Sequence, residues 1–295
     1  MSTDQRDGGR PGDVQGPTVP RMLVGIQLHR FREAAGITPD QAAYEIRASR
    51  SKISRMENGL VRFKERDVTD LLSLYGITDE LIRSSLVTLT RQANTPGWWS
   101  KYGDIMADWF EAYLGLETAA SVIRTFDLQF VNGLFQTEDY ARAVTMLGHT
   151  SAPADEIERR VSLRLKRQDV LTGPKPPQVW SVLDEGALRR PVGGTAVMRA
   201  QLRHLIEASR LPHVSIQVLP LSAGGHPAAG PLTMLRFGES ELPDVVYLEQ
   251  MLTAVYLTRP GDTAHYLDVL NRLAAQAEGF DATAATLERI LSART

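Results

Sequence analysis

The chain has 295 residues, of which 43% are hydrophobic and 23% charged, as in globular domains that bury a sizeable core. It contains no cysteine, so disulfides, thiolate zinc sites, iron–sulfur clusters and a cysteine nucleophile are excluded. No apolar run approaches the ~18 residues of a membrane helix, and no apolar segment marks a secretory signal, so we expect a cytoplasmic protein without a membrane partner.

The net charge of −2 is divided unevenly along the chain. Residues 21–66 hold ten Lys or Arg against five Asp or Glu, whereas residues 67–295 carry a net charge of −6. A basic segment placed before a larger acidic one indicates an anionic partner near the N-terminus.

Composition and turn sequences predict three parts. Residues 1–20 are rich in Gly and Pro and contain almost no apolar residues, so they are expected to be disordered. Residues 21–93 show helical spacing of apolar side chains and predict an all-α domain. The turn cluster Asn94-Thr95-Pro96-Gly97 opens residues 94–295, which predict an α+β domain.

The two predicted domains differ in the spacing of their apolar residues. Five short helices are expected in the first domain, over residues 21–35, 39–46, 50–58, 65–75 and 79–91. In the second domain a charged helix is expected over residues 156–171. Short β-branched runs predict strands at 179–183, 214–219, 232–237 and 245–249, and helices are expected at 198–208, 263–277 and 282–291.

Residues 36–59, GITPDQAAYEIRASRSKISRMENG, predict two short helices joined by a tight turn. This is the helix-turn-helix plan, whose second helix enters the major groove of double-stranded DNA. Ala43 supplies the small residue needed where the helices cross, and Ile53 supplies the apolar seat of the second helix. The outward face offers polar and basic groups suited to bases and phosphates: Ser49, Arg50, Ser51, Lys52 and Arg55. The alternative is a small helical bundle with a solvated basic face.

The same 24 residues resemble the Cro/repressor-type (XRE) helix-turn-helix family without a gap, most clearly over residues 53–59. The resemblance implies that base and phosphate contacts come from Ser49, Arg50, Ser51, Lys52, Ser54 and Arg55. It also implies that Glu57 is structural and pairs with a basic side chain inside the domain.

Two positions depart from that family. Pro39 stands where the family usually has a Gln that clamps a phosphate, and Arg47 stands in the turn where the family often has Gly. Arg47 is a candidate to replace the lost phosphate contact. Gln41, Lys64 and Arg66 are further candidates for contacts to the DNA backbone.

Further motifs lie in the second domain. They are Gly133–Ala143 (GLFQTEDYARA), Arg164–Gln168, Asp184–Arg189 and Tyr247–Glu249. With them, residues 98–291 resemble a C-terminal domain that follows XRE-type modules in antitoxin-like transcriptional regulators of actinobacteria, although Asn132 replaces a more usual Pro. The resemblance implies architecture rather than chemistry, and it implies an interaction with a small protein encoded beside such regulators.

Residues suited to catalysis form no recognisable constellation. The six histidines give no HExxH and no i, i+4 pair, and there is no Gly-x-Ser-x-Gly. Asp184 and Glu185 are adjacent acids, but Arg189 and Arg190 are obvious partners for them. We therefore expect no enzyme, no metal and no cofactor.

The aromatic segment after residue 97 leaves two alternatives open. Three of the four tryptophans lie within twelve residues. The favoured interpretation is a hydrophobic junction that packs the linker onto the second domain. The other is a pocket for a ligand or partner lined by Trp98, Trp99, Tyr102 and Trp109.

Together these patterns predict a sequence-specific DNA-binding transcriptional regulator that acts as a homodimer, because paired recognition helices bind operators better than one. The C-terminal domain is expected to dimerise and to receive a signal. Two alternatives remain: an antitoxin-like protein that acts mainly on a small protein partner, and a repressor that responds to a small molecule.

Overall fold

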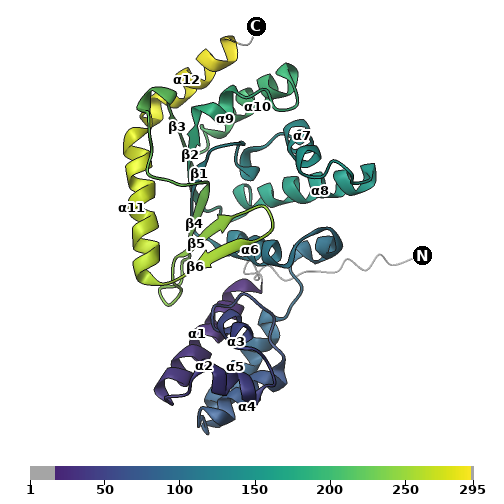
Figure 1. Cartoon of the computed structure of the whole chain (residues 1–295), viewed down its shortest axis with the longest axis vertical. Helices are drawn as coiled ribbons and strands as arrows, with labels where there is room; N and C mark the ends of the chain where they lie inside the picture. The colour runs from purple at the N-terminus through teal and green to yellow at the C-terminus, as the bar shows by residue number, and fades with distance from the viewer. Residues whose placement is uncertain (1–16, 294–295) are drawn as a thin grey trace, which may run out of the picture. The chain divides into compact units, whose positions relative to one another are not determined.

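The computed structural model describes residues 17–293, which form two compact units that divide between Gly97 and Trp98. Figure 1 shows the first unit as a group of helices and the second as a sheet flanked by helices, which confirms the predicted fold classes. Most of the predicted leader lies outside the described residues. The prediction of disorder is wrong for residues 18–20, because the first helix begins at Thr18 and accommodates Pro20 in its first turn, where no backbone donor is needed.

The first unit consists of five helices, as predicted. Their bounds are α1 (Thr18–Ala34), α2 (Pro39–Glu45), α3 (Arg50–Glu57), α4 (Glu65–Leu74) and α5 (Glu80–Ala93). Local signals set several of these limits. Gly36 adopts a positive φ of 65° after α1, and the Oδ1 atom of Asp79 accepts hydrogen bonds from the first backbone amides of α5.

Close helix contacts organise the core of this unit. A Cβ atom at Gly25 of α1 would lie 2.6 Å from the carbonyl oxygens of Met56 and Glu57, so α1 and the end of α3 meet at a distance that only glycine permits. Ala42 and Ala43 of α2 are buried in the same core. These small residues let one face of α3 pack closely against the other helices. The opposite face of α3 points outward.

The second unit is built on a six-stranded sheet with the order β3-β2-β1-β4-β5-β6. The strands are β1 (Val122–Asp127), β2 (Gln178–Asp184), β3 (Val214–Leu219), β4 (Leu232–Arg236), β5 (Val245–Glu249) and β6 (Ala254–Leu257). β1, β2 and β3 run parallel, whereas β4, β5 and β6 are joined by antiparallel pairing. Since β1 and β5 both oppose β4, their carboxyl ends lie at the same edge of the sheet.

Helices cover both faces of this sheet. α11 (Pro260–Gln276) lies along one face, and Figure 1 shows the others on the opposite side or at the top. Those α-helices are α6 (Asp108–Ala119), α7 (Glu138–Gly148), α8 (Ala154–Arg167), α9 (Glu185–Arg189), α10 (Thr195–Ala208) and α12 (Phe280–Ser292). Short 3-10 helices lie at η1 (Trp98–Ile105), η2 (Gly133–Phe135), η3 (Gln168–Leu171) and η4 (Leu221–Ala223). One apolar core lies between the sheet and α11 and includes Phe126, Val182 and Leu270.

The motif at residues 133–143 is a structural feature of the second unit. Gln201 donates to the carbonyl of Phe135 and accepts from the amide of Thr137, at 2.6 and 2.8 Å. Thr137 in turn caps α7, as its position in the sequence indicates. A Cβ atom at Gly133 would lie 2.8 Å from an Nη1 atom of Arg167, so glycine is required beside this arginine.

The aromatic segment packs inside the second unit. Trp99 and Tyr102 are buried with Leu114 and Leu163, so neither ring is open to solvent. Their polar atoms are also engaged, since the indole of Trp99 donates to Glu111 at 3.3 Å and the hydroxyl of Tyr102 bonds Ser162 at 3.0 Å. Trp98 and Trp109 are half-buried. Within residues 17–293, no helix combines the length and the hydropathy that crossing a membrane requires.

Candidate nucleic-acid interface

The turn between α2 and α3 has the compact form of a helix-turn-helix. Thr38 caps α2 in a capping box with Gln41, and Ser49 caps α3 by accepting from the amide of Lys52 at 3.2 Å. Between the helices, the amide of Ala48 donates to the carbonyl of Ala43 at 2.8 Å. Arg47 takes a positive φ of 52°, the conformation that favours glycine.

The outward face of α3 presents a row of predicted DNA contacts. Arg50, Ser51, Ser54 and Arg55 are exposed, while Ile53 and Met56 on the opposite face are buried. Arg50 lies 3.8 Å from a carboxylate oxygen of Asp40, with both side chains about 70% exposed. Such a pair contributes little to stability, so the guanidinium remains available to another acceptor.

Three other predicted contacts are engaged inside the unit. The Nζ atom of Lys52 lies 2.6 Å from a carboxylate oxygen of Asp67, which belongs to α4. The Oε1 atom of Gln41 accepts from the amide and hydroxyl of Thr38 at 2.8 and 2.9 Å. The hydroxyl of Ser49 caps its helix. Lys52 reaches DNA only if it exchanges or shares Asp67, whereas Ser49 keeps its hydroxyl proton and Gln41 its amide nitrogen to donate.

Basic and aromatic side chains border α3. Arg47 and Lys64 are exposed, and Lys64 precedes α4 without capping it by its side chain. Tyr44 is 86% exposed beside the turn, and with Glu45, Arg47 and Ala48 it lines an open hollow of about 520 Å³. The sequence pattern did not single out Tyr44, although its place beside the buried Ala42 and Ala43 on a short helix indicates an outward ring.

Glu57 is structural, as the resemblance implies. Its carboxylate oxygens accept from the Nε and Nη2 atoms of Arg32 at 2.5 and 3.0 Å, and its Oε2 atom lies 2.9 Å from the Nδ1 atom of His29. Arg32 is buried and also donates to the carbonyl of Ile37 at 3.0 Å. The end of α3 is therefore bound to α1 by a buried ion pair.

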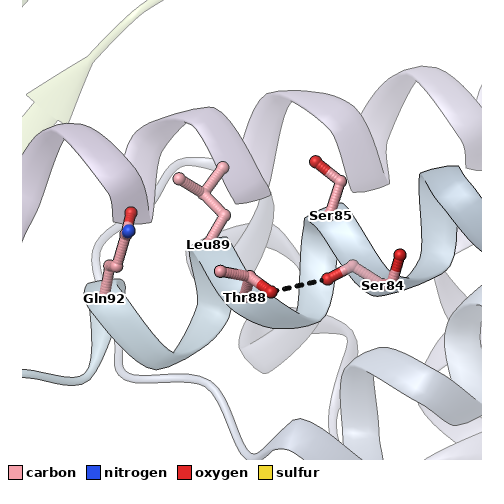
Figure 2. Close-up of a pocket in the computed structure, with 5 residues that line it drawn as sticks. All are labelled: Ser84, Ser85, Thr88, Leu89 and Gln92. Carbon is pink, nitrogen blue, oxygen red and sulfur yellow. Dashed lines mark hydrogen bonds between the residues drawn. The ribbon is translucent and has the colours of Figure 1, made fainter.

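Two other features of the chain bring polar groups together. Glu185 pairs with Arg189 at 2.6 Å and accepts from the amide of Leu221 at 2.9 Å, so this acid is bound within the fold. An open hollow of about 390 Å³ follows α5, and Figure 2 shows that all its lining residues come from that helix: Ser84, Ser85, Thr88, Leu89 and Gln92. None of these side chains is titratable, and they supply no acid or base for chemistry.

Replacing Arg47 by Gly is expected to raise the stability of the first unit by about 1 kcal/mol, because glycine adopts the positive φ without the cost of a Cβ atom. Arg47→Ala is the matched control, since it removes the same charge but keeps the Cβ atom. Urea unfolding followed by circular dichroism measures the difference. Equal stability of the two variants would contradict the assigned strain.

Each of the two units matches a different known family. Residues 23–84 match the model of the family described as Helix-turn-helix domain, and residues 110–289 match that described as Domain of unknown function (DUF5753). No curated protein and no solved structure matches the chain. The first match supports a DNA-binding regulator in general terms. The second covers more than half of the sequence, and the chain therefore belongs to the family described as Domain of unknown function (DUF5753), with a helix-turn-helix domain in front.

Proposed function

We propose that this protein is a sequence-specific, DNA-binding transcriptional regulator of the XRE type. The observation that carries the proposal is the two-sided character of α3. Its inner face is buried through Ile53 and Met56, while Arg50 and Arg55 extend from the outer face. Among residues 17–293, the side chains of these two arginines form a single ion pair, the weak and exposed one between Arg50 and Asp40. A helix of this kind fits the major groove.

In this proposal the contacts divide by chemistry. Arg50 and Arg55 bind base edges, because a guanidinium matches the O6 and N7 acceptors of guanine in a bidentate arrangement. Arg47, Lys64 and the hydroxyls of Ser51 and Ser54 bind phosphates or bases near them and set the register. The Lys52–Asp67 contact holds α3 against α4 and thereby orients the face.

We propose further that the protein binds as a homodimer. One helix of eight residues covers a single half-site, and two half-sites one helical turn apart give the affinity that operators require. Sedimentation equilibrium at tens of micromolar protein is expected to give the mass of a dimer. A monomer at that concentration would contradict this part of the proposal.

Selection of bound fragments from a random duplex library at two salt concentrations tests the DNA-binding proposal. Nonspecific phosphate binding falls steeply with salt, whereas a specific motif is expected to persist as a palindrome. Failure to enrich any motif at either salt concentration would overturn sequence-specific binding by the isolated protein.

Arg50→Ala is expected to weaken binding to the selected motif by about 1–3 kcal/mol and to relax the preference at one base pair. Arg30→Ala is the matched control, because Arg30 is an exposed arginine of α1 and its loss removes the same charge. Fluorescence anisotropy with the motif and with a scrambled duplex measures both effects. An equal loss on both duplexes would show that Arg50 contacts phosphate only.

A further inference from the structure

The two edges of the sheet in the second unit differ in how their backbone groups are paired. β3 forms one edge and β6 the other (Figure 1). At the β3 edge, the carbonyl of Val218 accepts from the amide of Glu278 at 2.9 Å, and the carbonyl of Ile216 accepts from the hydroxyl of Thr283 at 2.6 Å. The segment that leads into α12 therefore supplies hydrogen-bond partners to the outer side of β3.

The backbone groups on the outer side of β6 are open. The amide of Gln250 donates to the carbonyl of Thr253 at 2.9 Å across a two-residue turn, and this bond sets the alternation of the β5–β6 hairpin. Every second residue of β6 bonds to β5, so the amides and carbonyls of Ala254 and Tyr256 point away from the sheet. Within residues 17–293, these backbone groups form no hydrogen bond.

The sequence of this edge lacks the features that usually keep exposed strands apart. Natural edge strands carry a charged side chain, a proline or a bulge. Residues 250–258 read QMLTAVYLT and contain no charged residue, no Pro and no Gly. Met251 and Leu252 in the turn are 95% and 87% exposed, and Val255 in the strand is 38% exposed. The open backbone groups are thus bordered by exposed apolar side chains.

Local structure does not explain the residues of this turn. Two-residue turns between antiparallel strands favour Gly, Asn and Asp, which adopt the tight backbone conformations at low cost. Met251 and Leu252 have no such preference, and their exposure shows that they add nothing to a core. Apolar side chains gathered beside an open strand indicate a contact with another protein chain.

We propose that β6 is the dimer interface of the second unit and pairs antiparallel with β6 of a second copy. The interface rests on the homodimer proposed above and supplies its contact surface. An added strand satisfies open amides and carbonyls. With a two-fold axis at Val255, Ala254 of each copy pairs with Tyr256 of the other through both amides and both carbonyls. The two Val255 side chains then lie next to each other.

The distribution of charge favours a second copy as the partner. Near a two-fold axis each side chain meets its own copy, so a charged residue there would face an identical charge. The segment between Glu249 and Arg259 contains no charged residue, and both of these flanking residues are exposed. Antiparallel pairing places the acidic end of one hairpin at the same end of the joint sheet as the basic end of the other. The flanking charges at each end are therefore opposite in sign.

Sedimentation equilibrium of the full-length protein without DNA tests the interface. The wild-type chain is expected to be a dimer at tens of micromolar. Val255→Lys is expected to raise the Kd of the dimer at least tenfold, because it places two ammonium groups against each other at the axis. Leu221→Lys is the matched control. It makes the same change at another apolar residue of the second unit, one that is 58% exposed, and is expected to leave the Kd unchanged.

A second variant tests the backbone contacts. Ala254→Pro removes an amide that points away from β5, a place where an edge strand accommodates proline. The variant is therefore expected to keep the circular dichroism spectrum of the wild-type chain and a Tm within a few degrees of it. Its dimer is expected to dissociate with a Kd at least tenfold higher, because the amide donors nearest the axis are lost.

Oxidative cross-linking tests the register of the two strands. The chain contains no cysteine, so Val255→Cys carries a single thiol. Facing residues of an antiparallel pair without hydrogen bonds have Cα atoms about 4.5 Å apart, a distance that a disulfide spans. Val255→Cys is expected to give a covalent dimer on a non-reducing gel after copper-catalysed oxidation. Ala196→Cys, at an exposed residue of α10, is the control and is expected to remain a single chain on that gel.

The outcomes separate this interface from the rest of the proposed function. A monomeric wild-type chain would overturn the homodimer and the β6 interface together, and DNA binding would still be judged by the fragment selection. A wild-type dimer whose Kd is unchanged by Val255→Lys and Ala254→Pro would overturn the β6 interface alone. Equal cross-linking of Val255→Cys and Ala196→Cys would indicate random collision and would overturn the proposed pairing.

Discussion

Replacing Glu117 by Leu is expected to destabilise the second unit by about 3–5 kcal/mol, the largest effect of any substitution considered. The reason is that Arg167 would remain buried without its carboxylate. The side chains of the pair are only 7% and 3% exposed, and two hydrogen bonds of 2.8 and 2.9 Å join them. Tyr113 would also lose the acceptor of its buried hydroxyl.

Tryptophan fluorescence during urea unfolding measures this effect selectively, because all four tryptophans belong to the second unit. The double variant Glu117→Leu with Arg167→Leu is expected to recover much of the loss, since no unpaired charge remains. Asp104→Asn is the control: it breaks an exposed pair with Arg159 and is expected to leave the urea midpoint almost unchanged. Comparable losses for Glu117→Leu and Asp104→Asn would contradict the assigned role of burial.

Glu57→Ala is expected to destabilise the first unit by about 3 kcal/mol and to loosen the end of the recognition helix. Arg32 would lose a partner bonded at 2.5 and 3.0 Å, and its guanidinium is almost completely buried. Hydrogen exchange of peptides from residues 18–93 in the full-length chain measures the opening of this unit. Faster exchange is expected in α1 and α3 together, because the carboxylate joins these two helices.

Glu33→Ala serves as the matched control for this variant. Glu33 also contacts Arg32, at 2.7 Å, but its side chain is 61% exposed and its loss leaves the buried pair intact. The expected cost is below about 1 kcal/mol. If Glu33→Ala and Glu57→Ala accelerated exchange equally, the buried contact would not be what holds α3 in place.

Most of the first unit was predictable because its signals are local. Thr38, Ser49 and Asp79 are helix caps that act on amides two or three residues away, and Gly36 ends a helix through its own conformation. Such interactions leave their mark within a few residues of sequence. The predicted start of α1 came too late for two reasons. No side chain caps the N-terminus of this helix, and the Pro in its first turn continues the composition of the Gly- and Pro-rich leader.

Strands β1 and β6 were missed in the second unit, whereas the other four were predicted within one residue at each end. β1 carries Arg124 and Asp127, which are unusual in a central strand. The structure accommodates the first by stacking it on Trp180, with the guanidinium 4.3 Å from the ring, and by a hydrogen bond to Asn271 at 2.9 Å. β6 is only four residues long. β1 depends on β2 and β4, which are far away in the chain, whereas β6 pairs with β5 directly before it.

The candidate DNA interface and the buried charges of the second unit differ in how far the sequence alone reveals them. The exposed face of α3 follows from helical periodicity within eight residues, so Arg50 and Arg55 could be chosen from the sequence. The same periodicity does not show which polar side chains are free to bind DNA. Lys52, for example, forms an ion pair with Asp67 of another helix. The buried ion pair of Glu117 and Arg167 forms only when the fold brings α6 and α8 together. Periodicity and caps act locally and appear in the sequence, whereas charge pairing across the core requires contacts that only the folded chain creates.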